Sequence, residues 1–235
     1  MVERVNVFEE FEKAGLYKAI FSRRDIRSQF TDKPIEDDVL SRVLVAAHHA
    51  PSVGFMQPWN FIVIKSNDVK RRVHESFVRA NERAKAMFID DKKRQTYENL
   101  KLQGILESPL NICVTCDKSR FGPVVIGRTT NFNMDEYSVV CAVENLWLAA
   151  RAEGLGVGWV SILYDNDLTQ ILNLPEDVIP IAYLCIGYVT HFPESPELET
   201  VGWLPRMKLS DLIYSETWGN DCQTHLPELY KHVVK

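Results

Sequence analysis

The chain has 235 residues, of which 46% are hydrophobic and 25% are charged, and its formal net charge is −5. This composition is that of a globular protein and excludes disordered, collagen-like and coiled-coil proteins. The absence of a basic bias gives no support for a nucleic-acid partner or an anionic membrane surface. The length suits one full domain or two small ones, and we interpret residues 1–235 as a single domain.

The sequence also bears on the cellular compartment. No apolar run reaches the roughly 18 residues that a membrane-spanning helix needs. Residues 1–15 alternate apolar and acidic side chains and lack the hydrophobic stretch of a secretory signal. The five cysteines are irregularly spaced, which does not suggest a disulfide framework. We therefore expect a cytoplasmic protein without a membrane segment.

The predicted elements, in chain order, mix helices and strands. Apolar residues at near-helical spacing predict a helix over 7–21, and a proline-bounded amphipathic pattern predicts a second helix over 36–50. A run of aromatic and β-branched residues predicts a strand over 59–65, and the charged stretch 68–106 suits two surface helices. Further elements are strands over 110–116, 157–163 and 179–189, a short helix near 208–214, and a helix over 133–153 with Val139, Val140, Val143, Leu146, Trp147 and Ala150 on its apolar face. This order has no regular strand–helix–strand period, so it favours an α+β fold.

The first candidate site is the RRDIR sequence at residues 23–27, just after the first predicted helix. Guanidinium groups present planar sets of donors that match phosphate and carboxylate oxygens. The alternative is an ordinary solvated basic turn. Near the other end of the chain, Arg206 and Lys208 form a possible anion clamp.

The second candidate site is the connector at residues 50–60, APSVGFMQPWN, between a predicted helix and a predicted strand. Its two prolines stiffen the backbone, and Gly54 permits close approach of the backbone to a ligand. Ser52 and Gln57 offer hydroxyl and amide groups suited to an uncharged heterocycle. The alternative is an ordinary connector with helix-capping residues.

The third candidate is the glycine-rich sequence GLGVGWVS at residues 154–161. A dinucleotide-binding glycine motif follows a strand and opens a helix. Here the glycines follow a predicted helix and lead into a strand. We therefore interpret Gly154 and Gly156 as a helix end and a tight turn.

No metal site is predicted. Cys113 and Cys116 fall within one predicted strand, where their thiols point to opposite faces of the sheet. His48 and His49 lie at a predicted helix end, and no carboxylate accompanies them at metal-ligand spacing. We expect structural roles for all four residues.

Taken together, these clusters resemble the flavin-dependent nitroreductase superfamily. The arginine-rich turn, the A-P-S-x-x-x-x-Q-P-W connector, a G-x-G sequence before a late strand and a C-terminal arginine occur in this order between about residues 15 and 214. The resemblance implies a nitroreductase-like α+β fold, with a mostly antiparallel central sheet surrounded by helices. It also implies an intertwined homodimer that binds FMN at the subunit interface. Within the superfamily, residues 23–27, 48–60 and 158–161 are most similar to the branch of 5,6-dimethylbenzimidazole synthases, or flavin destructases.

The resemblance also implies roles for individual residues. Asp25 would be the acid or base, and Ser161 a positioning hydroxyl or proton relay. The alternatives are a salt bridge between Asp25 and its neighbouring arginines, and a plain polar strand residue at Ser161. The connector would come from the partner chain, Gly158 would line the isoalloxazine ring, and residues 68–106 would form a helical lid that Met87 and Phe88 help to close. The implied FMN-binding residues are Arg23, Arg24, Asp25, Ile26, Arg27, Pro51, Ser52, Gly54, Gln57, Gly158, Ser161 and Arg206, with Lys208 as a further phosphate candidate.

The implied reaction is the O₂-dependent fragmentation of reduced FMN to 5,6-dimethylbenzimidazole, the lower ligand of cobalamin, and erythrose 4-phosphate. Reduced FMN would come from a separate NAD(P)H-dependent flavin reductase. One alternative is a conventional FMN-dependent nitroreductase or dehalogenase that reduces an outside substrate, against which the aspartate at position 25 argues. The other is a protein that stores or senses FMN without turnover. Residues 215–235 form a C-terminal extension for which the sequence suggests no function.

Overall fold

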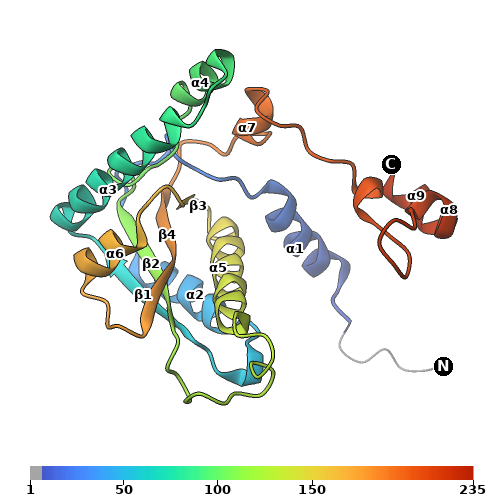
Figure 1. The fold of residues 1–235 in the computed structure, drawn as a ribbon, viewed down its shortest axis with the longest axis horizontal. Helices are drawn as coiled ribbons and strands as arrows, with labels where there is room; N and C mark the ends of the chain where they lie inside the picture. The colour runs from blue at the N-terminus through green and yellow to red at the C-terminus, as the bar shows by residue number, and fades with distance from the viewer. Residues whose placement is uncertain (1–6, 235) are drawn as a thin grey trace. The chain divides into compact units, whose positions relative to one another are not determined.

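The computed structural model describes residues 7–234 of the chain. It forms two compact units, Met1–Glu194 and Ser195–Lys235, here called the body and the tail. The tail contains α7 (Glu197–Thr200), the 3₁₀ helix η2 (Leu209–Leu212), α8 (Cys222–His225) and α9 (Pro227–Val233). The body contains α1 (Glu10–Ser22), α2 (Asp37–His48), the 3₁₀ helix η1 (Val53–Phe55), β1 (Trp59–Ile64), α3 (Asn67–Ala86), α4 (Asp91–Glu98), β2 (Leu110–Asp117), α5 (Met134–Ala152), β3 (Leu155–Val160), α6 (Asp165–Leu172) and β4 (Val178–Tyr188), as Figure 1 shows.

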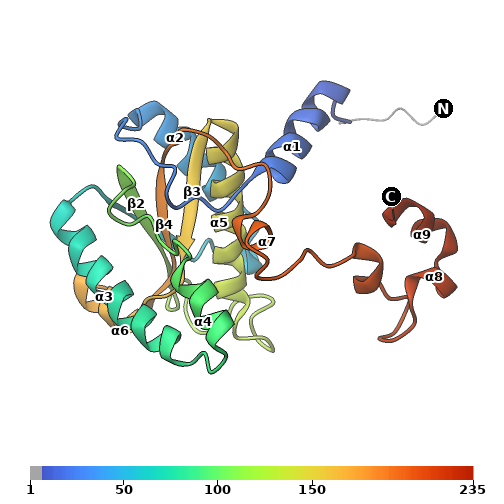
Figure 2. The same ribbon diagram turned by 90° about the horizontal axis from the view of Figure 1, so that it is seen from above.

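The centre of the body is a four-stranded antiparallel sheet in the order β1-β2-β4-β3. Helices α2 and α5 cover one face of this sheet, and α3 and α6 cover the other (Figure 2). The antiparallel α+β fold expected from the sequence is confirmed. Since β3 is the last strand in this order, one of its edges is open to pairing with a segment outside the sheet.

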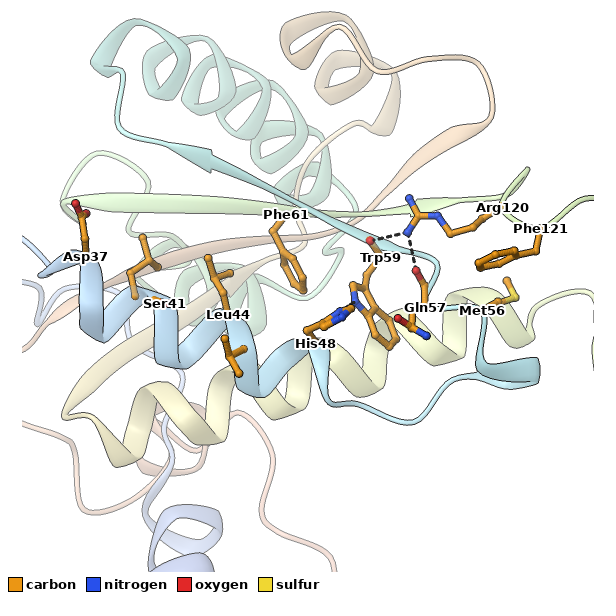
Figure 3. A pocket seen from close by; sticks show the side chains of 12 residues that line it. Asp37, Ser41, Leu44, His48, Met56, Gln57, Trp59, Phe61, Arg120 and Phe121 are labelled. Atoms are coloured by element: carbon orange, nitrogen blue, oxygen red, sulfur yellow. Dashed lines mark hydrogen bonds between the residues drawn. The ribbon is translucent and has the colours of Figure 1, made fainter.

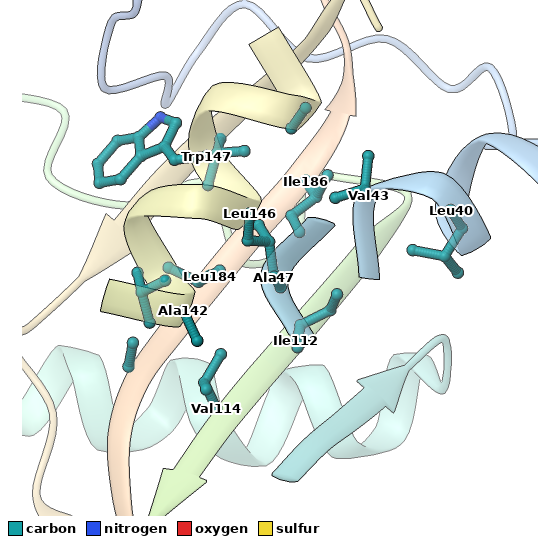
Figure 4. Close-up of a cluster of buried hydrophobic side chains, with 14 of the residues drawn as sticks. Leu40, Val43, Ala47, Ile112, Val114, Ala142, Leu146, Trp147, Leu184 and Ile186 are labelled. Carbon is teal, nitrogen blue, oxygen red and sulfur yellow. The ribbon is translucent and has the colours of Figure 1, made fainter. Parts of the chain in front are cut away.

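The larger core lies between the sheet and the α2–α5 pair (Figure 4). Val139, Val143 and Leu146 recur at helical spacing on α5 and are at most 1% exposed. Full burial of such a side chain contributes about 1.5–3 kcal/mol, so this face fixes α5 firmly on the sheet. One residue assigned to this face by the pattern, Val140, is 42% exposed and points away from the core.

Most predicted elements are confirmed, with several differences. The strand predicted over 157–163 begins at Leu155 and ends at Val160, so Gly156 lies inside β3 and Ser161 follows the strand. Gly154 does end α5, with a φ of 80°. The helix predicted over 7–21 begins at Glu10, and none of its residues is buried. The short helix near 208–214 is the 3₁₀ helix η2, and α6 was not predicted.

The cysteines and histidines considered as metal ligands have structural surroundings. Cys116 belongs to the core under α2 and α5, whereas Cys113 belongs to the core on the opposite face of the sheet. His48 is the last residue of α2, and its Nδ1 accepts the indole N–H of Trp59 at 3.1 Å. Among the helices of residues 7–234, none combines the length and the hydrophobicity needed to cross a bilayer.

Candidate functional site

The segment at residues 23–27 runs along the open edge of β3. The Ile26 N–H donates to the Val157 carbonyl at 3.0 Å, and Asp25 forms a parallel bridge with the same residue. Gly158 makes this approach possible, because a Cβ at that position would lie 2.0 Å from the Ile26 carbonyl oxygen. The sheet edge thus sets the position of the arginine-rich segment.

The carboxylate of Asp25 has a partner at each oxygen. Oδ1 accepts the backbone N–H of Trp159 at 3.1 Å, and Oδ2 pairs with the guanidinium of Arg27. The side chain of Asp25 is 31% exposed and that of Arg27 is 12% exposed. The salt bridge considered from the sequence is therefore present with Arg27. These two partners orient the carboxylate while 31% of the side-chain surface stays exposed. The acid–base role of Asp25 stays a prediction.

The other two arginines of the segment have different neighbours. The guanidinium of Arg23 lies 4.6 Å from the centroid of the Trp147 ring and forms no hydrogen bond within residues 7–234. Arg24 donates from Nη1 to the carbonyls of Phe21 at 2.9 Å and of Arg23 at 2.7 Å, and from Nη2 to the carbonyl of Glu194. Its Nε is buried without a hydrogen-bond partner. A buried donor of this kind is rare and is often satisfied by a water or an ion.

The connector between α2 and β1 is shaped by hydrogen bonds from side chains. Ser52 Oγ accepts the N–H of Gln57 at 3.1 Å, and the N–H of Val53 donates to Ser138 Oγ on α5 at 3.0 Å. Gly54 and Gln57 have positive φ values of 53° and 45°. Because a positive φ is unfavourable for a residue such as Gln57, the surrounding contacts must hold this conformation in place.

Arg120, which sequence reasoning missed, supports the connector from the loop after β2. Its Nη1 donates to the carbonyls of Gln57 at 2.6 Å and Trp59 at 3.1 Å (Figure 3). Its Nη2 donates to Asn60 Oδ1 at 2.6 Å. Arg120, Gln57 and Trp59, together with residues of α2, border a mostly apolar cavity of about 620 Å³. No local sequence signal points to Arg120, because it lies some sixty positions after its partners.

Helix α5 separates the connector from the arginine-rich segment. Ser138, in the first half of α5, holds the connector, whereas Trp147 lies beneath Arg23. Arg151, in the last turn, donates from Nε to the Ser22 carbonyl at 3.2 Å. At 1.5 Å per residue, Ser138 lies about 14 Å from Trp147 and about 20 Å from Arg151 along the helix axis. Within one chain, the two candidate clusters are therefore near opposite ends of α5.

The remaining predicted residues are spread over the body and the tail. Ser161 is exposed and borders a cavity of about 180 Å³, and Ile26 is fully buried. Arg206 and Lys208 are exposed residues of the tail. The FMN contacts assigned to these residues, to Pro51 and to Gly158 stay predictions.

The region expected to be a lid consists of α3, α4 and the loop that follows. Met87, just after α3, is 75% exposed. Phe88 packs on Tyr97 of α4, with ring centroids 4.8 Å apart. An exposed apolar residue at the junction of two helices suits a surface that covers a ligand, and the lid function stays a prediction.

Comparison with known proteins agrees with this geometry. A family model described as the nitroreductase family matches residues 20–188. The chain is 38% identical over 200 residues to the 5,6-dimethylbenzimidazole synthase of Rhodospirillum rubrum. The aligned region covers 85% of this chain and 94% of that protein.

Solved structures show the same fold. A BluB-like flavoprotein from Clostridium difficile 630 matches 86% of this chain and 99% of its own, with 19% identity and a TM-score of 0.65. An oxidized iodotyrosine deiodinase bound to FMN and 3-iodo-L-tyrosine matches 77% of this chain and 94% of its own, with 22% identity and a TM-score of 0.65. At these identities the structural matches show a shared fold alone.

Proposed function

Because this chain belongs to the nitroreductase family, we propose that it fragments reduced FMN with O₂ to 5,6-dimethylbenzimidazole and erythrose 4-phosphate. The observation that carries the proposal is the 38% identity to a 5,6-dimethylbenzimidazole synthase over 94% of that relative's length. Asp25, held at the β3 edge among arginines, adds a carboxylate where the proposed reaction needs proton transfer. The product is the lower ligand of cobalamin, so the protein would serve cobalamin synthesis.

The donor set fits the phosphate of FMN. The guanidinium of Arg23 forms no hydrogen bond within the described residues, and the Nε of Arg24 is a buried donor without a partner. Guanidinium groups bind phosphate oxygens through paired, charge-assisted hydrogen bonds. Reduced FMN, when bound, supplies both the electrons for O₂ and the atoms of the product. The chain's own part is to bind the phosphate and to orient the ribityl end toward Asp25.

Asp25 is proposed to hold or move a proton near the ribityl chain. Its hydrogen bond from the Trp159 N–H and its pairing with Arg27 fix the direction of the carboxylate, which general acid–base catalysis requires. Ser161, which directly follows β3, is proposed to position a proton through its exposed hydroxyl. A lid formed by residues 68–106 would exclude water from the reacting flavin.

The exposed apolar surface supports a homodimer with a shared site. Single-chain proteins rarely expose large contiguous apolar patches. A second copy whose α5 runs antiparallel to the first would bring the connector of one chain toward the arginines of the other, across the separation that α5 imposes. The exposed side chains around the first half of α5, between 42% and 86% exposed, are Phe55, Val124, Ile126, Phe132, Tyr137 and Val140.

The proposal includes a second enzyme. Each turnover consumes one reduced flavin, so electrons must enter from outside the chain, and we propose a separate NAD(P)H-dependent flavin reductase as their source. On the sequence grounds given above, both would act in the cytoplasm.

One incubation separates the possible functions. The purified protein is mixed with FMN, NADH and a flavin reductase in air, and the products are followed by mass spectrometry. New 5,6-dimethylbenzimidazole that disappears when O₂ is removed supports the proposal. Intact flavin with reduction of an added nitroaromatic or iodotyrosine supports the conventional flavoenzyme instead. Intact, bound flavin without turnover of any substrate supports a storage or sensing protein.

A further inference from the structure

Three guanidinium groups near the C-terminal end of α5 have no carboxylate partner. They belong to Arg23, Arg24 and Arg151, here called the arginine cluster, and none of them forms an ion pair with an acidic side chain in residues 7–234. Seven other arginines pair with aspartate or glutamate: Arg27, Arg42, Arg71, Arg79, Arg94, Arg120 and Arg128. The remaining described arginines without such a partner, Arg72, Arg83 and Arg206, are exposed to solvent, whereas the arginine cluster is half-buried.

Arg151 is the member of the cluster that comes from a different element. Its Nε donates to the Ser22 carbonyl at 3.2 Å, and its guanidinium lies 3.8 Å from the centroid of the Phe192 ring. The nearest acidic residue in sequence, Glu153, is occupied, since both of its carboxylate oxygens accept from Arg42, at 2.8 and 2.9 Å. The two terminal nitrogens of the Arg151 guanidinium therefore have no hydrogen-bond acceptor in the described residues, and its positive charge has no carboxylate partner.

The electrostatics of the cluster are unfavourable without a bound anion. Partial burial, and then the positive charge of Arg24, lower the pKa of Arg151. The Nε of Arg24 is also buried without a hydrogen-bond partner. The cluster therefore lacks both a hydrogen-bond acceptor and a compensating negative charge. Partly buried like charges are costly unless an anion compensates them. A dianionic phosphate would supply both the charge and the acceptors.

We infer that Arg151 is a phosphate-binding residue and that, with Arg23 and Arg24, it forms the cradle for the phosphate of FMN. This inference rests on the proposed FMN binding. It adds a residue of α5 to a phosphate site that was otherwise assigned to the turn after α1. Arg27 differs from the cluster because its charge is compensated by Asp25.

The test compares two ligands that differ only in the phosphate. FMN and riboflavin are titrated into the purified protein and into the variants Arg151→Met and Arg151→Lys, with flavin fluorescence as the readout. Loss of a charge-assisted bond should weaken FMN binding roughly 10- to 100-fold in Arg151→Met. Riboflavin binding should change less than about twofold, and Arg151→Lys, which keeps the charge, should recover part of the loss. The control is Lys65→Met, an exposed cationic residue just after β1 and outside the proposed lid, which should leave both affinities unchanged.

The outcomes decide between binding and support. If Arg151→Met weakens the binding of FMN and of riboflavin equally, Arg151 only supports the end of α1, and the inference is overturned. Unchanged affinity for both ligands overturns it as well. If Arg151→Met does not fold, the FMN-to-riboflavin ratio of Arg151→Lys decides in the same way. A wild type that binds FMN without making dimethylbenzimidazole overturns the proposed reaction and still allows the inference to be judged. A wild type that binds no FMN overturns both.

Discussion

At the scale of single residues, Asp25 combines two demands that usually conflict. A carboxylate that only balances charge can be fully enclosed, whereas one that transfers protons needs a side open to the substrate. Its pairing with Arg27 and the Trp159 N–H meets the first demand, and its 31% exposure meets the second. The geometry therefore allows both readings that the sequence left open.

Asp25→Asn should separate flavin binding from flavin fragmentation. The amide keeps an oxygen for the Trp159 N–H but cannot act as an acid or base. General acid–base catalysis typically contributes about 10²–10⁴-fold, so formation of dimethylbenzimidazole should fall by that factor. FMN affinity should survive because the arginine cluster is intact. The two measurements are product formation by mass spectrometry and FMN binding by fluorescence. Asp177→Asn, an exposed aspartate just before β4 and outside the proposed lid, is the control, and a wild-type rate in Asp25→Asn would refute the catalytic role.

At the scale of elements, the edge of β3 and the shape of the connector determine where the functional groups lie. The arginine-rich segment approaches β3 only because Gly158 carries no side chain, and the connector keeps its shape because Arg120 binds its carbonyls. Both devices act on backbone position, so substitutions there should affect the site indirectly.

Gly158→Ala should displace the arginine-rich segment. The added Cβ would lie 2.0 Å from the Ile26 carbonyl oxygen, which requires a backbone shift and should destabilise the fold by about 1–3 kcal/mol. Product formation should fall along with the thermal midpoint, because Asp25 loses its place at the Trp159 N–H. Gly15→Ala is the matched control: it lies within α1 with no atom within 4 Å of the added Cβ. This change should be neutral or stabilising by up to about 1 kcal/mol. Equal thermal midpoints for the two variants would contradict the argument.

Arg120→Met should loosen the connector. The variant leaves the carbonyls of Gln57 and Trp59 without their guanidinium donor, and hydrogen bonds to a charged group contribute about 1.5–3 kcal/mol. We expect a lower midpoint in urea unfolding and weaker FMN binding. Lys231→Met, an exposed cationic residue of α9 outside the proposed lid, serves as the control and should change neither quantity. Unaltered urea unfolding in Arg120→Met would show that the connector holds its shape without this residue.

At the scale of the whole molecule, the exposed apolar surface supports the proposed homodimer. No residue of α1 is buried, and its aromatic side chains Phe11, Tyr17 and Phe21 are between 54% and 75% exposed. The outer face of α5 is apolar as well, at Tyr137 and Val140. Burial of these side chains against another chain would contribute on the order of 25 cal/mol per Å² of apolar surface removed from water.

We expect the wild type to sediment as a homodimer, and Val140→Lys to shift it toward the monomer. A lysine in the interface would bury an unpaired charge, which is strongly unfavourable. FMN affinity should fall with dimerisation, because the proposed site uses both chains. Val63→Lys on β1, outside the proposed lid, is the matched control, since Val63 is 40% exposed and Val140 is 42% exposed. A monomeric wild type with full FMN affinity would contradict the shared site.

The sequence by itself determined the elements whose signals are local. The amphipathic spacing of Val139, Val143 and Leu146 specified α5, and the β-branched runs specified the strands, because these patterns repeat within a few residues. The order of the arginine-rich turn and the connector was enough to indicate the family. Strand ends were less certain, and Ser161 fell just outside β3, because backbone pairing with β4 sets that boundary.

Only the tertiary structure decided which distant groups meet. Arg151 donates to the Ser22 carbonyl, Arg120 donates to the Gln57 carbonyl, and Gly158 lies against Ile26, although these partners are far apart in the chain. These contacts follow from how α5 and β3 pack against the arginine-rich segment and from the pairing of β1 with β2, and no local pattern encodes that packing. The exposure of Val140 has the same origin: the helical period places it near the apolar stripe, but the sheet covers only one side of α5. A helix's sequence tells how its faces differ, and the neighbouring elements decide which of them is buried.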